Sequence, residues 1–160
     1  MDTWYIKEII GTIISVAVIA ALWSIFEKLR STEVSIIIHD DSIDLKTNKN
    51  EISVKPILHF SRDRKNKLLG IGDDFQSNEP SFKIDLFKYK GEVNGIKDYH
   101  ILLSAFFRKA IYNLTGQSFF SRPFIKVKGA ENIYAINNEV CANSFHKALK
   151  QAGAGRSILL

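Results

Sequence analysis

The sequence predicts an α/β protein in which an N-terminal transmembrane helix precedes a small domain with a mixed sheet and two main helices. Three observations predict this class. A long uncharged apolar run opens the chain, short strand-like runs joined by polar turns follow, and the last third alternates helical and strand patterns. We expect residues 1–30 to form the anchor with its flanks and residues 33–160 to form the α/β domain.

The opening apolar run, residues 9–26, contains no charged side chain. A membrane-spanning helix needs roughly 20 mostly apolar residues. Trp4, Tyr5 and Trp23 lie near the ends of the run, where interfacial aromatic residues are typical. The side chains expected to anchor the helix in the lipid bilayer are Ile9, Ile10, Ile13, Ile14, Val16, Val18, Ile19, Leu22, Trp23 and Phe26.

Three other interpretations of this run fit less well. A cleavable signal peptide would have a basic start and a shorter apolar core. An amphipathic surface helix would show a polar face, and a buried globular helix is seldom so uniformly apolar. Lys28 and Arg30 follow the run, and cytoplasmic flanks carry the excess of cations. We therefore expect a single-pass protein of the inner (cytoplasmic) membrane with a cytoplasmic domain.

Short strands are expected next along the chain. "TEVSIIIHD" and "SIDLKTN" each have strand character, and "KNEISVKPILHFSRD" is a strand pattern broken by Pro56. "NKLLGIGDDF" is a further short strand that ends at its glycines. The stretch Phe75–Glu92 is the least structured part of the domain by its pattern.

Two helices and two strands are expected after that stretch. Asp98 is a candidate N-cap for a helix over Tyr99–Asn113, which Gly116 would end. "PFIKVKG" is a strand pattern. A second helix begins after Asn137 or Asn138 and runs through Gln151, with Cys141, Phe145, Ala148, Leu149 and Ala152 on its apolar stripe. "RSILL" begins a last strand.

Charge and cysteine content narrow the function classes. The formal net charge is +5, which favours acidic partners such as anionic lipid, nucleic acid or an acidic protein face. A solvated basic surface explains the same balance more simply, and we expect no nucleic-acid partner. The chain has one cysteine, Cys141, so it forms no internal disulfide, and no Cys/His cluster has zinc-ligand spacing.

The order of elements, together with four fragments, resembles the N-terminal subdomain of the bacterial actin-like rod-shape (MreB) family. The fragments are "KPILHFSRDRKNKLLGIGDDF", "KIDLFKYKGEVNGIKDYHILLSAFFRKAI", "RPFIKVKG" and "ANSFHKALKQAGAGRSILL". Within them, residues 90–93, Asp98, Phe107, Ala148 and residues 152–154 match the family's pattern. The resemblance covers about residues 34–160 and implies a truncated actin-like (RNase H-like) fold.

The departures from that family concern nucleotide chemistry. The family's first hairpin has a glycine that lets backbone N–H groups approach phosphate. The equivalent turn here is His39–Ser42, which has no glycine and carries two carboxylates. The family's catalytic glutamate and second phosphate loop would lie beyond Leu160. We therefore interpret His39–Ser42 as a β-turn and expect no catalytic residue, no cofactor and no metal.

The expected function is a non-catalytic, membrane-anchored binding or scaffolding module, linked by the resemblance to the cell-shape cytoskeleton. Its partners would be an actin-like filament protein or a second copy, contacted through the terminal strand at Ile158, Leu159 and Leu160. Equally, that strand could be central in its own sheet. One alternative is a metal-dependent nuclease-like or phosphoryl-transfer domain using Asp40, Asp41 and Asp73. Another is a membrane-tethered effector that oligomerises.

Overall fold

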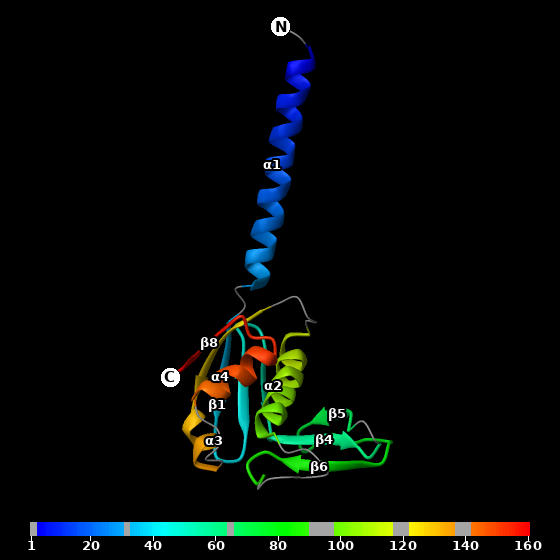
Figure 1. Ribbon diagram of the computed structural model, residues 1–160, viewed down its shortest axis with the longest axis vertical. Helices are drawn as coiled ribbons and strands as arrows, with labels where there is room; N and C mark the ends of the chain where they lie inside the picture. The colour runs from blue at the N-terminus through cyan, green and yellow to red at the C-terminus, as the bar shows by residue number, and fades with distance from the viewer. Residues whose placement is uncertain (1–2, 31–32, 64–65, 90–97, 117–121, 137–141) are drawn as a thin grey trace.

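The protein is described by a computed structural model. The structure describes residues 3–30, 33–63, 66–89, 98–116, 122–136 and 142–160. In the first helix, α1 (Thr3–Arg30), it describes the side chains of residues 12–25. A five-stranded sheet, a three-stranded sheet and three further helices form the α/β domain, from which α1 projects (Figure 1).

The five-stranded sheet is mixed, as the sequence predicts. Its strands are β1 (Glu33–Ile38), β2 (Ile43–Lys46), β3 (Glu51–Val54), β7 (Phe124–Lys128) and β8 (Arg156–Leu159), in the order β3-β2-β1-β7-β8. β1, β2 and β3 form an antiparallel meander, whereas β1, β7 and β8 run parallel. The parallel order requires crossover connections, and helices supply them.

The sheet is covered on one face by α2 (Tyr99–Thr115) and α4 (Ala142–Gln151), which pack on each other. Alternate residues of β1 are buried beneath them, namely Val34, Ile36 and Ile38. The rings of Phe106 and Phe145 both pack edge-on against Phe107, and all three are fully buried. A short helix that the sequence did not predict, α3 (Ala130–Ile136), follows β7.

The second sheet has the order β5-β4-β6 and contains β4 (Ile57–Ser61), β5 (Leu68–Ile71) and β6 (Ser81–Asp85). Pro56 separates β3 from β4, and the two strands belong to different sheets. The sequence marked Phe75–Glu92 as the least structured stretch, yet β6 lies within it. β6 pairs with β4 along its whole length, and this pairing is invisible in the local pattern.

The predicted helix ends are confirmed in part. Asp98 is the N-cap of α2, although its side chain makes no capping hydrogen bond, and Gly116 ends the helix at φ 62°. The predicted second helix is α4, whose stripe residues Phe145, Ala148, Leu149 and Ala152 are buried. Its predicted start at Asn137 or Asn138, and Cys141, lie outside the described residues.

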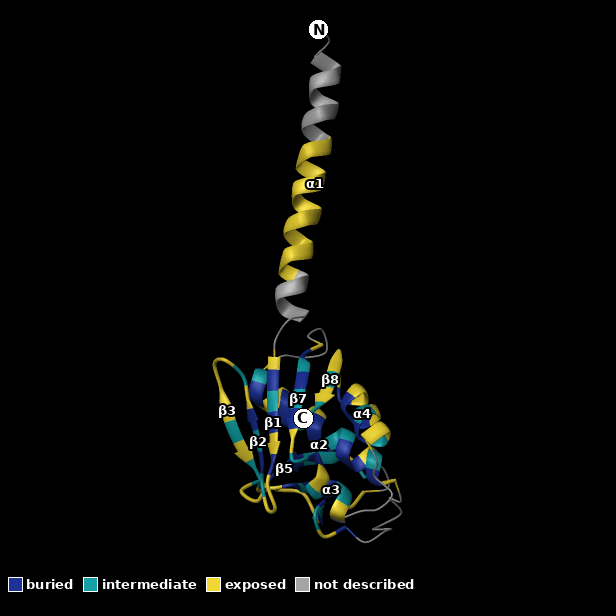
Figure 2. Ribbon diagram, turned by 90° about the vertical axis from the view of Figure 1, so that its left-hand side faces the viewer, coloured by how far each residue is buried: buried dark blue, intermediate teal, exposed yellow. Residues whose placement is uncertain are grey.

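The predicted membrane anchor requires a correction. α1 is helical, and its described side chains are exposed (Figure 2). Within the stretches that the structure describes, no helix is both long enough and apolar enough to cross a membrane. This finding contradicts the predicted transmembrane helix and the single-pass inner-membrane location, and it leaves the lipid bilayer unsupported as a partner.

The individual anchor residues divide into two groups. Seven of them have described side chains, each at least half exposed: Ile13, Ile14, Val16, Val18, Ile19, Leu22 and Trp23. The side chains of Ile9, Ile10 and Phe26 lie outside the described part of the helix. The described apolar surface of α1 is therefore not covered by the α/β domain.

Candidate functional site

The turn between β1 and β2 contains the two aspartates that the sequence analysis weighed as part of a β-turn or of a metal-dependent active site. The backbone N–H of His39 donates to the carbonyl of Ser42 at 2.9 Å, which closes a tight turn. The hydroxyl of Ser42 donates to a carboxylate oxygen of Asp41 at 3.1 Å. The side chains of His39, Asp40 and Asp41 are exposed. Residues 39–42 therefore form a tight connection between β1 and β2, which agrees with the interpretation of this stretch as a turn.

A three-residue polar chain lies beside this turn. The hydroxyl of Ser53 donates to Asp44 Oδ1 at 2.6 Å, and His39 Nε2 lies 2.9 Å from Asp44 Oδ2. The hydrogen bond from Ser53, helped by the one from His39, lowers the pKa of the Asp44 carboxyl. Asp44 stands between the serine and the histidine, so the imidazole is not placed to take the proton of the Ser53 hydroxyl.

A metal site of the nuclease-like kind would need the carboxylates of Asp40, Asp41 and Asp73 to cluster, and one of them already has a cationic partner. Asp73 forms an ion pair with Lys55, whose Nζ lies 2.6 Å from Oδ2. This contact raises the pKa of Lys55, and the charges of Asp41 and Asp74 add to it. Across the described residues, no three His, Cys, Asp or Glu side chains cluster as metal ligands. Asp40, Asp41 and Asp73, which the nuclease-like alternative required, therefore do not converge on one point.

The four histidines also have separate partners. His59, buried in β4, lies with Nε2 2.7 Å from the carbonyl of Gly72. His100 contacts the side chain of Gln151, and His146 contacts the hydroxyl of Ser157. Each ring therefore has a structural contact of its own.

A close backbone approach beside the β1–β2 turn was missed by the sequence analysis. Gly129 follows β7 at φ 77°, and a Cβ added there would collide with the carbonyl oxygen of Ile38. The side chain of Asn132 donates to the same carbonyl at 3.0 Å. The sequence showed Gly129 as a strand end, but the contact depends on the parallel pairing of β1 with β7.

The terminal strand β8 lies at an edge of the five-stranded sheet. Among the described strands, β7 is its single neighbour. Ile158 is 38 % exposed and Leu160 is 64 % exposed, whereas Leu159 is partly buried against the core. The sequence left open whether this strand is central or at an edge, and the sheet order places it at an edge.

The fold is similar to that of a solved structure. A non-polymerising mutant of MamK bound to AMPPNP superimposes with a TM-score of 0.56 at 8 % sequence identity. The chain has an actin-like fold. The match covers 81 % of this chain and 40 % of that chain, so the present chain spans less than half of its neighbour.

The likeness to MamK comes from the comparison of structures and has no counterpart in the two comparisons of sequence. No protein-family model and no curated protein matches the chain. At this identity the likeness to MamK concerns the arrangement of strands and helices alone. It agrees with the actin-like, RNase H-like architecture that the fragments of the sequence resembled.

Proposed function

We propose that this chain is a non-catalytic actin-like module that acts by binding other proteins, as a scaffold of the cytoskeletal kind. The observation that carries the proposal is the β1–β2 turn, at the first hairpin of the fold. Glycine-rich hairpins hold phosphate because backbone N–H groups can come close to it. Here Asp40 and Asp41 occupy the turn, and their negative charges oppose the approach of phosphate.

The polar groups around this turn support the same proposal. The carboxylate of Asp44 accepts hydrogen bonds within the domain, and Asp73 is paired with Lys55. The uncovered face of the sheet contains further internal ion pairs, Lys46 with Glu51 and Lys126 with Glu33. Charged side chains that satisfy one another in this way suit a stable surface better than a reaction centre.

The proposed partners are an actin-like filament protein or another copy of this chain. Two apolar surfaces favour a role in binding: the described side chains of α1 and the edge strand β8 with Ile158 and Leu160. Large exposed apolar patches mark sites of interaction.

Nucleotide titration tests the non-catalytic part of the proposal. Calorimetry of the full chain with Mg²⁺–ATP at millimolar nucleotide is expected to give no binding heat, and a phosphate-release assay no turnover. An actin-like ATPase measured in the same buffer serves as the positive control. Binding at micromolar concentration would overturn the proposal and our account of residues 39–42.

Co-sedimentation tests the scaffolding part. The full chain is expected to pellet with preformed filaments of a bacterial actin-like protein, or to form larger species by itself in light scattering. The chain without filaments and a globular protein of similar mass are the controls. A chain that remains monomeric and stays in the supernatant would contradict the scaffold.

A further inference from the structure

Among the strands that the structure describes, β8 pairs with β7 alone, so one of its edges carries no neighbouring strand. The N–H of Leu160 donates to the carbonyl of Val127 in β7 at 2.8 Å. Successive residues of a strand direct their backbone groups to opposite sides. Leu160 and Ile158 therefore bond towards β7, whereas Ser157 and Leu159 direct their N–H and C=O groups to the free edge. This edge can accept a further strand.

The side chains of β8 divide between the two faces of the sheet. Ser157 lies on the helix face, because its hydroxyl is 2.7 Å from Nδ1 of His146 in α4. Arg156 and Ile158 project from the opposite, uncovered face and are exposed. A strand added to this edge would therefore meet a cation and an apolar side chain two residues apart on one face.

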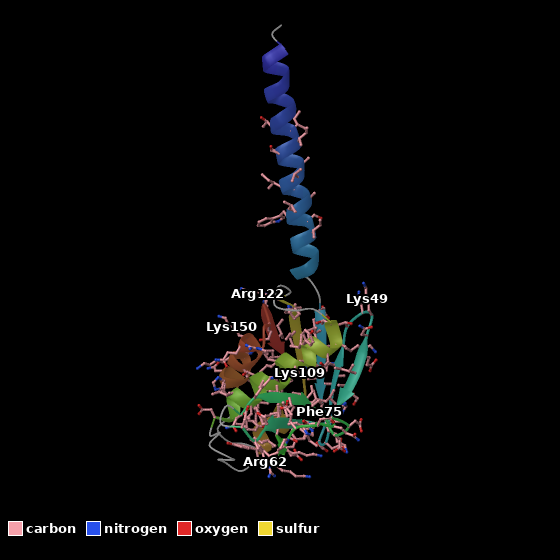
Figure 3. The ribbon with its side chains drawn as sticks, turned by 90° about the vertical axis from the view of Figure 1, so that its right-hand side faces the viewer. Lys49, Arg62, Phe75, Lys109, Arg122 and Lys150 are labelled. Carbon is pink, nitrogen blue, oxygen red and sulfur yellow. The ribbon has the colours of Figure 1, made fainter. Side chains whose placement is uncertain are left out.

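Two further cations lie near the start of the edge strand. The carbonyl of Arg122 lies against Gly155, directly before β8. Lys150 is one helical turn after His146, on the side of α4 that contacts Ser157. Figure 3 shows Arg122 and Lys150 at the same end of the domain, beside the terminal strand. Arg122, Lys150 and Arg156 form no ion pair with any residue that the structure describes.

From this arrangement we infer that the free edge of β8 binds an extended acidic segment of a partner protein, which joins the sheet as an additional strand. Backbone hydrogen bonds to Ser157 and Leu159 would hold the segment. An acidic residue would lie beside Arg156, and an apolar residue two positions away would pack on Ile158. The inference rests on the proposed binding function and specifies the contact chemistry of the partner.

The same cations disfavour a second copy of β8 as the occupant. Parallel, in-register pairing of two β8 strands would bring two sets of Arg122, Lys150 and Arg156 together at one end of the edge, and like charges that face each other weaken an interface. An acidic strand neutralises these cations instead. Charge complementarity therefore favours an acidic segment over a second β8 strand paired in parallel.

A fluorescent peptide of alternating glutamate and valine tests the inference in fluorescence anisotropy with the full chain. We expect saturable binding that weakens with added salt. The matched peptide of alternating lysine and valine should not bind. The glutamate peptide with N-methyl groups at alternate residues keeps the charge but loses its backbone donors, and it should bind at least about tenfold more weakly.

Substitutions in the protein locate the site. Arg156→Glu should weaken binding at least about tenfold, whereas Arg62→Glu, which reverses an exposed cation at the opposite end of the domain, should not (Figure 3). Ser157→Pro removes an N–H from the free edge and should weaken binding, whereas Ser157→Ala retains that N–H and should bind normally. Circular dichroism checks that each variant is folded.

Three results would overturn the inference: no binding of the glutamate peptide, equal loss with Arg156→Glu and Arg62→Glu, or unchanged binding of the N-methylated peptide. Disulfide crosslinking of Ile158→Cys in two copies, in a Cys141→Ser background, would show instead that a second copy covers the edge. Each of these peptide-binding and crosslinking results is compatible with the proposed scaffolding function if the chain still pellets with filaments. Tight ATP binding would contradict the proposed non-catalytic function but would not contradict the proposed peptide site.

Discussion

Lys55 and Asp73 form an ion pair in which the lysine Nζ lies 2.6 Å from the carboxylate Oδ2. The pair joins the end of β3 to the segment after β5, next to the β1–β2 turn. It gives Asp73 a cationic partner from within the chain. The charges of Asp41 and Asp74 also act on this lysine, so the acidic residues at this end share an internal cation.

Magnesium is therefore expected to leave the protein unaffected. Thermal unfolding of the full chain, followed by circular dichroism, should show the same midpoint with and without millimolar MgCl₂. Lys55→Ala removes the internal cation and leaves the acids in place, so this variant should gain a small upward shift in Mg²⁺. An upward shift for the unsubstituted chain would contradict the assignment of Lys55 as the partner of Asp73.

The hydrogen bond from Ser53 to Asp44 predicts a specific pH dependence. It lowers the pKa of Asp44 in the folded protein, so it stabilises the fold above the unfolded pKa. That stabilisation is lost as the pH falls through the folded pKa. Ser53→Ala should raise the pKa of Asp44, measured by NMR titration of its carboxyl, and should reduce the loss of stability between neutral and acidic pH. Thr47→Ala, a hydroxyl removal at the other end of β2, should leave that pKa unchanged.

The aromatic cluster between α2 and α4 should dominate the stability of the domain. Phe107 is fully buried, and its ring packs against Phe106 and Phe145. Phe107→Ala should lower the free energy of unfolding by about 3–5 kcal/mol in a urea titration. Tyr112→Ala, on the same helix but 48 % exposed, should cost less than about 1 kcal/mol. Equal costs would show that the cluster is not the centre of the core.

The contact between Gly129 and Ile38 should tolerate no side chain. Gly129→Ala places a Cβ at positive φ and against the carbonyl of Ile38, so we expect a loss of at least about 2 kcal/mol. Gly116→Ala shares the positive φ but has open space around the added Cβ, so it should cost about 1 kcal/mol. Urea titrations compare the two variants, and equal losses would show that the backbone approach is unimportant.

The sequence by itself determined most of the local elements. A run of β-prone apolar residues predicted β1, and alternation at Ile43 and Leu45 predicted β2. Pro56 separated β3 from β4, and Asp98 and Gly116 bounded α2. These signals are local, because side-chain spacing and backbone restrictions act within a few residues. The turn at residues 39–42 was predictable for the same reason.

Tertiary structure alone decided which elements lie together. β6 exists because it pairs with β4, and β8 is at an edge because the sheet order ends there. The ion pair of Lys55 with Asp73 joins the segments that follow β3 and β5, which are strands of two different sheets. The collision that keeps Gly129 a glycine comes from Ile38 in another strand. The predicted transmembrane helix was contradicted although the apolar run is helical. Contacts between distant residues depend on the summed packing of the whole chain, and no local pattern carries that information.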